Sequence, residues 1–335
     1  MISFKNKSMK DYLLKILQDK NKMGGQLVIL RKPKDERPGS DIDIMVPNNL
    51  QKKEVCYKFL NHISKDNWKI ISYRELDYLL SIIIVNNSKL NEEAIKIDFF
   101  EKIGWLGLSK NNLKYDFSKK DIIESRAYLT VAQKFMYAGK FEEKDIERVK
   151  YHFNESLIFL QVTDLIRGNI YQNKKLSILL KWRIRFRISG YSAWEMPYWT
   201  IIVLFKSLRN KFKPYRSPVL SVFLNFSNGR SVHKIIENLI NTYKKSGDSS
   251  LPKLSSLNVN ISNAFQRKVL HLISTYVFKT HICFFINTMQ SINSNKKHIL
   301  ESINIDGNNE LKDINSKIIN QLDKLIIQKN FKITN

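Results

Sequence analysis

The sequence predicts an α/β (α+β) protein, with a mixed sheet near the N-terminus, a helical middle region and a small C-terminal α/β or helical domain. Three observations support this fold class. Short apolar runs and period-two alternation between residues 26 and 100 are bounded by Gly, Pro and Asn, as is typical of strands. Apolar residues recur at helical spacing between 121 and 166. A new apolar run and helical pattern begin after residue 217.

The N-terminal elements mix helices with strands. Residues 6–22 have apolar side chains at helical spacing, and Gly24 and Gly25 follow as a helix end. A second helix is predicted at 50–64. The predicted strands are 26–31, 41–46, 68–73, 78–85 and 94–100. One sheet with helices is therefore expected in a first domain at 1–120.

The rest of the chain divides at two changes of pattern. Residues 121–216 are expected to form a second region with helices at 121–138 and 141–166, followed by a basic and aromatic segment. A third domain is expected at 217–335. Its predicted elements are a strand at 219–224, a helix at 232–244, a Ser-rich loop at 246–256, further helical segments, and a strand plus helix at 298–328.

The chain of 335 residues is strongly basic, with 56 Lys and Arg, 31 Asp and Glu, and a formal net charge of +25. Residues 151–335 hold 27 basic and 10 acidic residues. This imbalance favours an anionic partner such as nucleic acid, a phosphorylated substrate or lipid headgroups, with a solvated basic surface as the alternative. Two distant cysteines and six unclustered histidines indicate neither a disulfide framework nor a zinc site. The N-terminus lacks the features of a secretory signal, and no apolar stretch is as long as a membrane span, so a cytoplasmic location is expected.

Acidic residues within two predicted strands are the main candidates for chemistry. Asp41 and Asp43 occur in the run DIDIMV after Gly39-Ser40, and side chains two apart in a strand share a face. Asp98 lies in the later strand KIDFF. If these strands are neighbours, three carboxylates converge, as a Mg²⁺ (or Mn²⁺) site for phosphoryl transfer requires. The alternative is that Asp41 and Asp43 cap a turn or face solvent.

The segments GSDIDIMV and KIDFF resemble the nucleotidyltransferase (polymerase beta-like) superfamily. The resemblance implies that Asp41, Asp43 and Asp98 bind metal, that Asp98 also serves as general base, and that a nucleoside triphosphate is the donor. The superfamily usually has Gly-Ser at the end of the preceding strand, where this chain has Leu30-Arg31. Arg31 is therefore expected to contact a phosphate through its guanidinium, with Lys32 and Ser40 as further phosphate-binding candidates. An ion pair between Arg31 and the acidic loop that follows is the alternative.

Residues 23–150 more closely resemble the nucleotidyltransferase family proteins of bacterial surface-polysaccharide gene clusters, on the strings VILRKPKDERPGSDIDIMV, AIKIDFFEKIGWLGL and QKFMYAGKFEEK. This resemblance implies nucleotidyl or phosphoryl transfer to a hydroxyl of a sugar or glycan intermediate. An RNA- or antibiotic-directed nucleotidyltransferase is an alternative. A catalytically inactive, membrane-associated assembly factor is another.

The run VLSVFLNFSNGRSVHKIIENLI resembles the strand, P-loop and helix of a thymidylate-kinase-like domain. Gly229, Arg230 and Ser231 stand where Gly-Lys-Ser is usual, and Asn225 replaces the first glycine. The resemblance therefore implies a degenerate, inactive kinase-like domain. An unrelated α/β or helical domain is the alternative.

Basic residues alternate with aromatic and aliphatic ones between 181 and 188, an aromatic segment follows at 191–205, and a basic cluster follows at 206–216. This pattern suits a membrane surface, which would make the protein peripheral at the inner face of the plasma membrane. It also suits single-stranded nucleic acid, a less favoured partner here, or a core segment with a solvated basic face.

Overall fold

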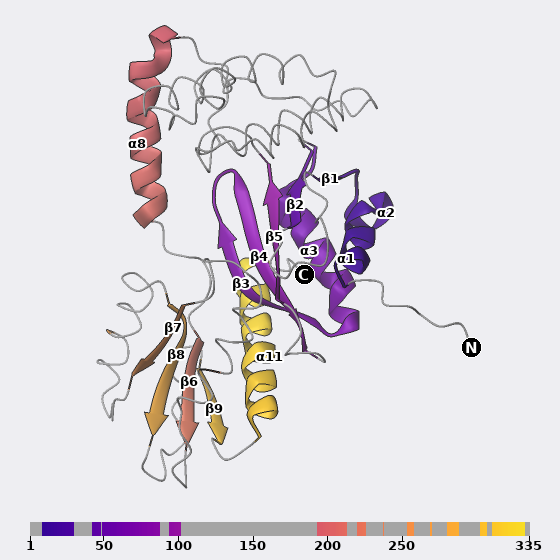
Figure 1. Cartoon of the computed structure of the whole chain (residues 1–335), viewed down its shortest axis with the longest axis vertical. Coiled ribbons are helices and arrows are strands. Elements are labelled where there is room, and N and C mark those ends of the chain that lie inside the picture. The colour runs from indigo at the N-terminus through magenta and orange to yellow at the C-terminus, as the bar shows by residue number, and fades with distance from the viewer. Residues whose placement is uncertain are drawn as a thin grey trace, which may run out of the picture.

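The computed structural model describes residues 9–29, 42–47, 49–87, 94–101, 193–212, 220–225, 237, 253–257, 269, 280–287, 302–306 and 310–331. These residues form helices, a five-stranded mixed sheet and a four-stranded sheet (Figure 1). The combination of helices with a mixed sheet agrees with the predicted α+β class. The helices predicted at 121–138 and 141–166, and the domain boundaries at 120 and 216, lie outside the described residues.

The helix predicted at 6–22 is divided into α1 (Met9–Gln18) and α2 (Lys20–Met23). Asp19 lies between them in an extended conformation, and its carboxylate accepts hydrogen bonds from the backbone N–H groups two and three residues later, at 3.1 and 3.2 Å. Because a side chain in this position satisfies the unpaired donors of a helix start, Asp19 begins a new helix. Gly24, with φ of +77°, ends α2 as predicted.

The first sheet has the strand order β1-β2-β5-β4-β3. Its strands are β1 (Val28–Ile29), β2 (Ile42–Met45), β3 (Trp68–Glu75), β4 (Leu79–Asn86) and β5 (Ala94–Phe100). β2 and β5 pair in parallel, and the other neighbours are antiparallel. Each strand overlaps a predicted one, and α3 (Lys52–Ile63), followed by the short turn η1 (Ser64–Asp66), matches the helix predicted at 50–64.

The pleat of the first sheet separates an apolar face from a face that carries acids. Ile42 and Ile44 of β2, together with their neighbours on β5, belong to a buried core that also contains side chains of α1 and α3. Successive side chains of a strand point to opposite faces. Asp43 therefore lies on the face away from this core, as does Asp98 of β5.

The second sheet is entirely parallel, with the order β7-β8-β6-β9. Its strands are β6 (Leu220–Asn225), β7 (Lys253–Leu257), β8 (Thr280–Asn287) and β9 (Ser302–Asp306). The first of these strands along the chain, β6, lies between β8 and β9. The C-terminal part of the chain therefore contains a parallel sheet and is not purely helical.

Two strands of the second sheet lie where other structure is predicted. β7 begins inside the predicted loop at 246–256, and β8 lies where helical segments are expected. The sequence of β8, THICFFIN, is a short apolar run without alternation, and periodicity cannot tell a buried strand from a helix in such a run. Residues 280–287 form a strand because they pair with β7 on one edge and with β6 on the other.

The last helix connects the two sheets. α11 (Leu311–Asn330) follows β9 and lies along β3 of the first sheet (Figure 1). Ile326 and Phe331 are buried in the main core of the first sheet. The ring of Phe331 stacks on Tyr57 at a centroid distance of 5.6 Å and meets Tyr73 edge-on at 5.4 Å. A helix from the end of the chain thus completes the N-terminal core.

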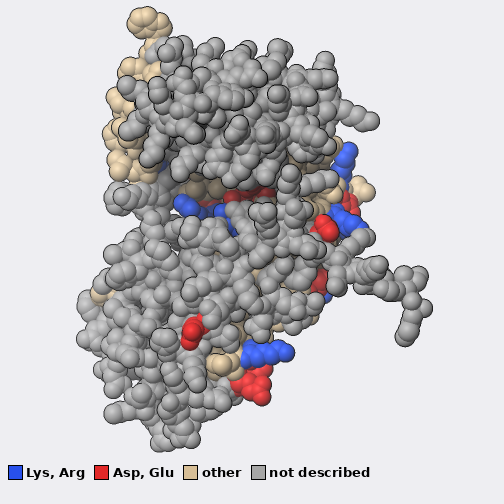
Figure 2. Space-filling model, viewed as in Figure 1, with Lys and Arg blue, Asp and Glu red and all other residues tan. Residues whose placement is uncertain are grey.

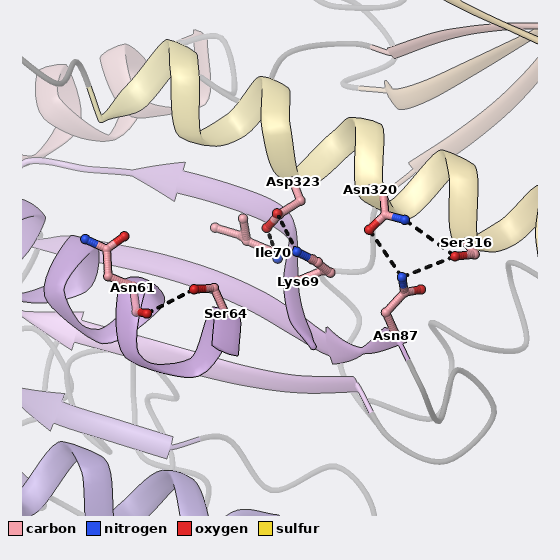
Figure 3. A network of polar contacts seen from close by, with 8 residues as sticks. All are labelled: Asn61, Ser64, Lys69, Ile70, Asn87, Ser316, Asn320 and Asp323. Atoms are coloured by element: carbon pink, nitrogen blue, oxygen red, sulfur yellow. Dashed lines mark hydrogen bonds and ion pairs between the residues drawn. The ribbon is translucent and has the colours of Figure 1, made fainter. Parts of the chain in front are cut away.

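Polar contacts accompany this apolar packing (Figure 3). The Asp323 carboxylate on α11 accepts a hydrogen bond from the backbone N–H of Ile70 at 2.9 Å and forms an ion pair with Lys69 at 3.4 Å. Asn87, which directly follows β4, donates through Nδ2 to two side chains of α11, each at 3.2 Å. These bonds hold the helix to the edge strand β3 and to the end of its neighbour β4.

Replacing Asp323 with asparagine is expected to change how stability depends on pH. Burial raises the pKa of Asp323, and the Ile70 N–H and Lys69 oppose this with smaller effects. The folded protein therefore keeps a proton that the unfolded chain releases near pH 3.9, so this group lowers the free energy of unfolding as pH rises to its folded pKa. Asp323→Asn removes this titration. Urea unfolding over a pH series should show the variant gaining stability relative to wild type through that window.

A matched variant checks the assignment. Lys69→Met removes the opposing ammonium, so the window should extend to higher pH. A constant difference between Asp323→Asn and wild type at every pH would contradict the raised pKa.

Within the described residues there is also α8 (Met196–Phe212), which follows the short turn η4 (Ala193–Glu195) and lies at the edge of the structure (Figure 1). Among the described helices, none combines the length and apolar character needed to span a membrane. Residues 181–192 of the predicted basic and aromatic segment lie outside the described residues.

Candidate active site

Two buried aspartates are neighbours on the acid-bearing face of the first sheet. Asp43 of β2 and Asp98 of β5 are paired in register across the parallel strands. Adjacent strands are ~4.8 Å apart, and residues paired in this way direct their side chains to the same face. Asp43 is 1% exposed and Asp98 is 6% exposed. The fold therefore holds two carboxylates side by side in a position largely closed to water.

Alternation along the two strands explains this placement. Ile42 and Ile44 on β2, and Ile97 and Phe99 on β5, are fully buried in the main core. Moving either strand by one residue would bring its acid into the apolar core and move the large side chains to the acid-bearing face. The favourable free energy of burying the apolar residues thus offsets the cost of placing two acids next to each other on the other face.

Lys96 supplies a positive charge next to this pair. Its Nζ lies 3.3 Å from Oδ2 of Asp98, two residues further along the same strand. On the neighbouring strand, Ser81 of β4 is in register with Asp98 and is also buried. Two adjacent carboxylates repel each other, and a nearby cation reduces that cost. The ammonium group offsets one of the two negative charges, and a divalent cation could offset the remainder.

A small apolar cluster adjoins the acids on the same face. Met45 and Phe100 lie two residues beyond Asp43 and Asp98 on their strands, and they pack with Val28, Leu76 and Tyr78. These side chains are all buried. The carboxylates therefore lie beside apolar groups, where their interaction with a cation is stronger than in water.

An ion pair between Lys52 and Glu101 ties α3 to the end of β5. The backbone N–H of Lys52, the first residue of α3, donates to Oε1 of Glu101 at 2.9 Å, and Lys52 Nζ lies 2.5 Å from Oε2. A carboxylate at a helix start satisfies an unpaired donor and interacts favourably with the helix dipole. Because Glu101 follows β5 directly, this contact helps to position the strand that carries Asp98.

Acidic and basic side chains of the described residues lie close together on one face of the molecule. Figure 2 shows acidic and basic side chains close together across the middle of the molecule, whereas the edge formed by α8 is largely uncharged. The uneven charge seen in the sequence is thus not repeated as a single-sign field over the described residues in this view.

Several predicted site residues lie outside the described residues. They are Asp41, the phosphate-binding candidates Arg31, Lys32 and Ser40, and the degenerate P-loop residues Gly229, Arg230 and Ser231. Of the predicted carboxylate triad, the described residues contain Asp43 and Asp98. Within this part of the chain, no group of three or more His, Cys, Asp or Glu side chains is arranged to hold a metal ion.

Sequence reasoning missed Lys96, Ser81, Lys52 and Glu101. Lys96 was recognisable, because a residue two positions before Asp98 in a strand shares its face. Ser81 could be found only from the pairing of β4 with β5. Lys52 and Glu101 are 49 residues apart, and no local pattern connects them.

A scan against protein-family models, a search of curated proteins and a search of solved structures each found no significant match. The resemblance to nucleotidyltransferases therefore depends on the sequence motifs described above.

Proposed function

We propose that this protein catalyses metal-dependent transfer of a nucleotidyl or phosphoryl group to a hydroxyl acceptor. The observation that carries the proposal is the pairing of Asp43 with Asp98, two nearly inaccessible carboxylates on adjacent parallel strands. Buried acids on adjacent strands are costly to a fold, so their presence favours a functional role over a structural one.

The donor set of this pair fits Mg²⁺ or Mn²⁺. Both prefer oxygen ligands, and Mg²⁺ usually takes one or two carboxylates and completes its coordination with water and substrate phosphates. Asp43 and Asp98 would hold the ion, with Asp41 as the third ligand implied by the sequence resemblance. When bound, the metal would neutralise charge on the transferred group and orient it.

Asp98 and Lys96 would then act on the acceptor hydroxyl, as general base and as the residue that positions the base. In the nucleotidyl reaction, the acceptor oxygen forms a bond to the α-phosphorus while the bond from that phosphorus to the pyrophosphate oxygen breaks. The hydroxyl proton passes to an Oδ atom of Asp98, which is the general base in this proposal. Lys96, already paired with Asp98, would help to hold that carboxylate in position. The products are the acceptor carrying a nucleoside monophosphate, and pyrophosphate.

The substrate classes follow from the resemblance to the surface-polysaccharide family. A nucleoside triphosphate is the proposed donor, and a sugar or glycan intermediate is the proposed acceptor. The apolar cluster beside the acids would help to exclude water from the reacting groups.

A product assay tests the proposal. The full-length protein is incubated with each of the four common nucleoside triphosphates, Mg²⁺ or Mn²⁺, and a panel of sugar acceptors. Release of pyrophosphate that depends on metal and acceptor would support nucleotidyl transfer, whereas release of nucleoside diphosphate would support phosphoryl transfer. No release of either from a folded preparation would contradict the proposal.

A further inference from the structure

The outward face of α8 is a continuous apolar surface. Tyr198, Ile201, Phe205 and Leu208 follow one another at spacings of three and four residues, which places them along one side of the helix, and Trp194 lies in the turn η4 that leads into it. Each is more than half exposed, with Trp194 at 94% and Phe205 at 69%. Leu204, also more than half exposed, widens the same face. This set of six side chains is called the α8 apolar face below.

The opposite side of α8 includes a buried residue. Val203 is 3% exposed, and it lies about half a turn around the helix from Phe205. Val203 is therefore covered while the apolar face of the helix is exposed. Exposed apolar side chains that gather in this way usually mark an interaction surface.

Basic residues border the α8 apolar face. Lys206 and Arg209 lie on the same edge of the helix, three residues apart, and α8 contains no Asp or Glu. In the sequence, residues 167–216 hold 12 basic residues and one acid, Glu195. The apolar and aromatic side chains of this face suit the boundary between headgroups and acyl chains. The cations beside it suit the anionic headgroups of a lipid surface.

We propose that α8 docks the protein on an anionic lipid membrane, with its apolar face entering the boundary between headgroups and acyl chains. Lys206 and Arg209 would reach the headgroup phosphates while their aliphatic stems stay along the apolar face. This inference is independent of the proposed reaction, since it uses none of the residues of the candidate active site.

The composition of the face favours lipid over other occupants. Single-stranded nucleic acid would use the aromatic rings for stacking, but Ile201, Leu204 and Leu208 cannot stack on bases. A second copy of the chain would bring two sets of like charges together along the contact. Lipid accepts both the aliphatic side chains and the cations.

Co-sedimentation of the full chain with vesicles tests the inference. Wild type should bind mixed phosphatidylcholine and phosphatidylglycerol vesicles and bind phosphatidylcholine alone much less. Phe205→Glu places a charge in the apolar face. Ser207→Glu places the same charge on an exposed position of the same helix, two residues away and outside that face.

Both variants lose electrostatic attraction, worth about fivefold per charge at an anionic surface. Phe205→Glu also loses burial of the ring, so its binding should fall at least about tenfold further than that of Ser207→Glu. Circular dichroism melts should match wild type for both, because both positions are exposed.

Three results would overturn the inference. Equal losses in both variants would mean that charge alone drives binding. Binding to a thymidine oligonucleotide without binding to vesicles would assign the face to nucleic acid. A dimer detected by light scattering that Phe205→Glu dissociates, without vesicle binding, would assign it to a second copy.

Discussion

Asp98→Asn is expected to lower kcat/KM for the transfer reaction by about 10²–10⁴-fold, the usual contribution of a general base. Asparagine keeps the size of the side chain but can neither accept the hydroxyl proton nor contribute a negative charge to a metal site. Asp43→Asn should lower kcat and shift the Mg²⁺ dependence to higher concentration, because it removes a charged ligand. Steady-state assays over a range of Mg²⁺ concentrations measure both effects.

The matched control is Asp313→Asn, which makes the same chemical change at an exposed position on α11. It should leave kcat/KM unchanged. Thermal unfolding of all three variants shows whether any loss of activity reflects loss of fold. Wild-type rates in a folded Asp43→Asn or Asp98→Asn variant would show that the carboxylate pair has no role in catalysis. The chain could still be a transferase that uses other residues.

Phe331→Ala is expected to lower the free energy of unfolding by about 3–5 kcal/mol, and Ile326→Ala by about 2–5 kcal/mol. Phe331 is 5% exposed and its ring contacts those of Tyr57 and Tyr73, so removing it leaves a cavity between α11 and the first sheet. Ile326 is 1% exposed in the same core. Urea unfolding followed by circular dichroism measures the change.

Lys324→Ala is the control for these core variants, because Lys324 is exposed on the same helix. Its effect should stay within about 0.5 kcal/mol, as for most surface substitutions. A loss of less than about 1 kcal/mol in Phe331→Ala would show that the C-terminal helix adds little to the N-terminal core.

Much of the first sheet could be predicted because its signals are local. Period-two alternation in IDIM and AIKIDFF marks both the strand and the side of it that is buried. Gly24 marks a helix end through its left-handed conformation. The division of the first helix at Asp19 was missed, because an aspartate within a helical pattern can be either a surface residue or a cap.

The sequence by itself determined that Asp43 and Asp98 each lie on a strand, opposite to apolar neighbours, because alternation is a property of the strand alone. Only the tertiary structure decided that the two acids are adjacent, because strand order and register depend on pairing between segments 55 residues apart. The same holds for Ser81 beside Asp98, for the strand β8, and for α11 in the N-terminal core. Each of these depends on contacts between distant segments, and such contacts leave no periodic signal in the chain.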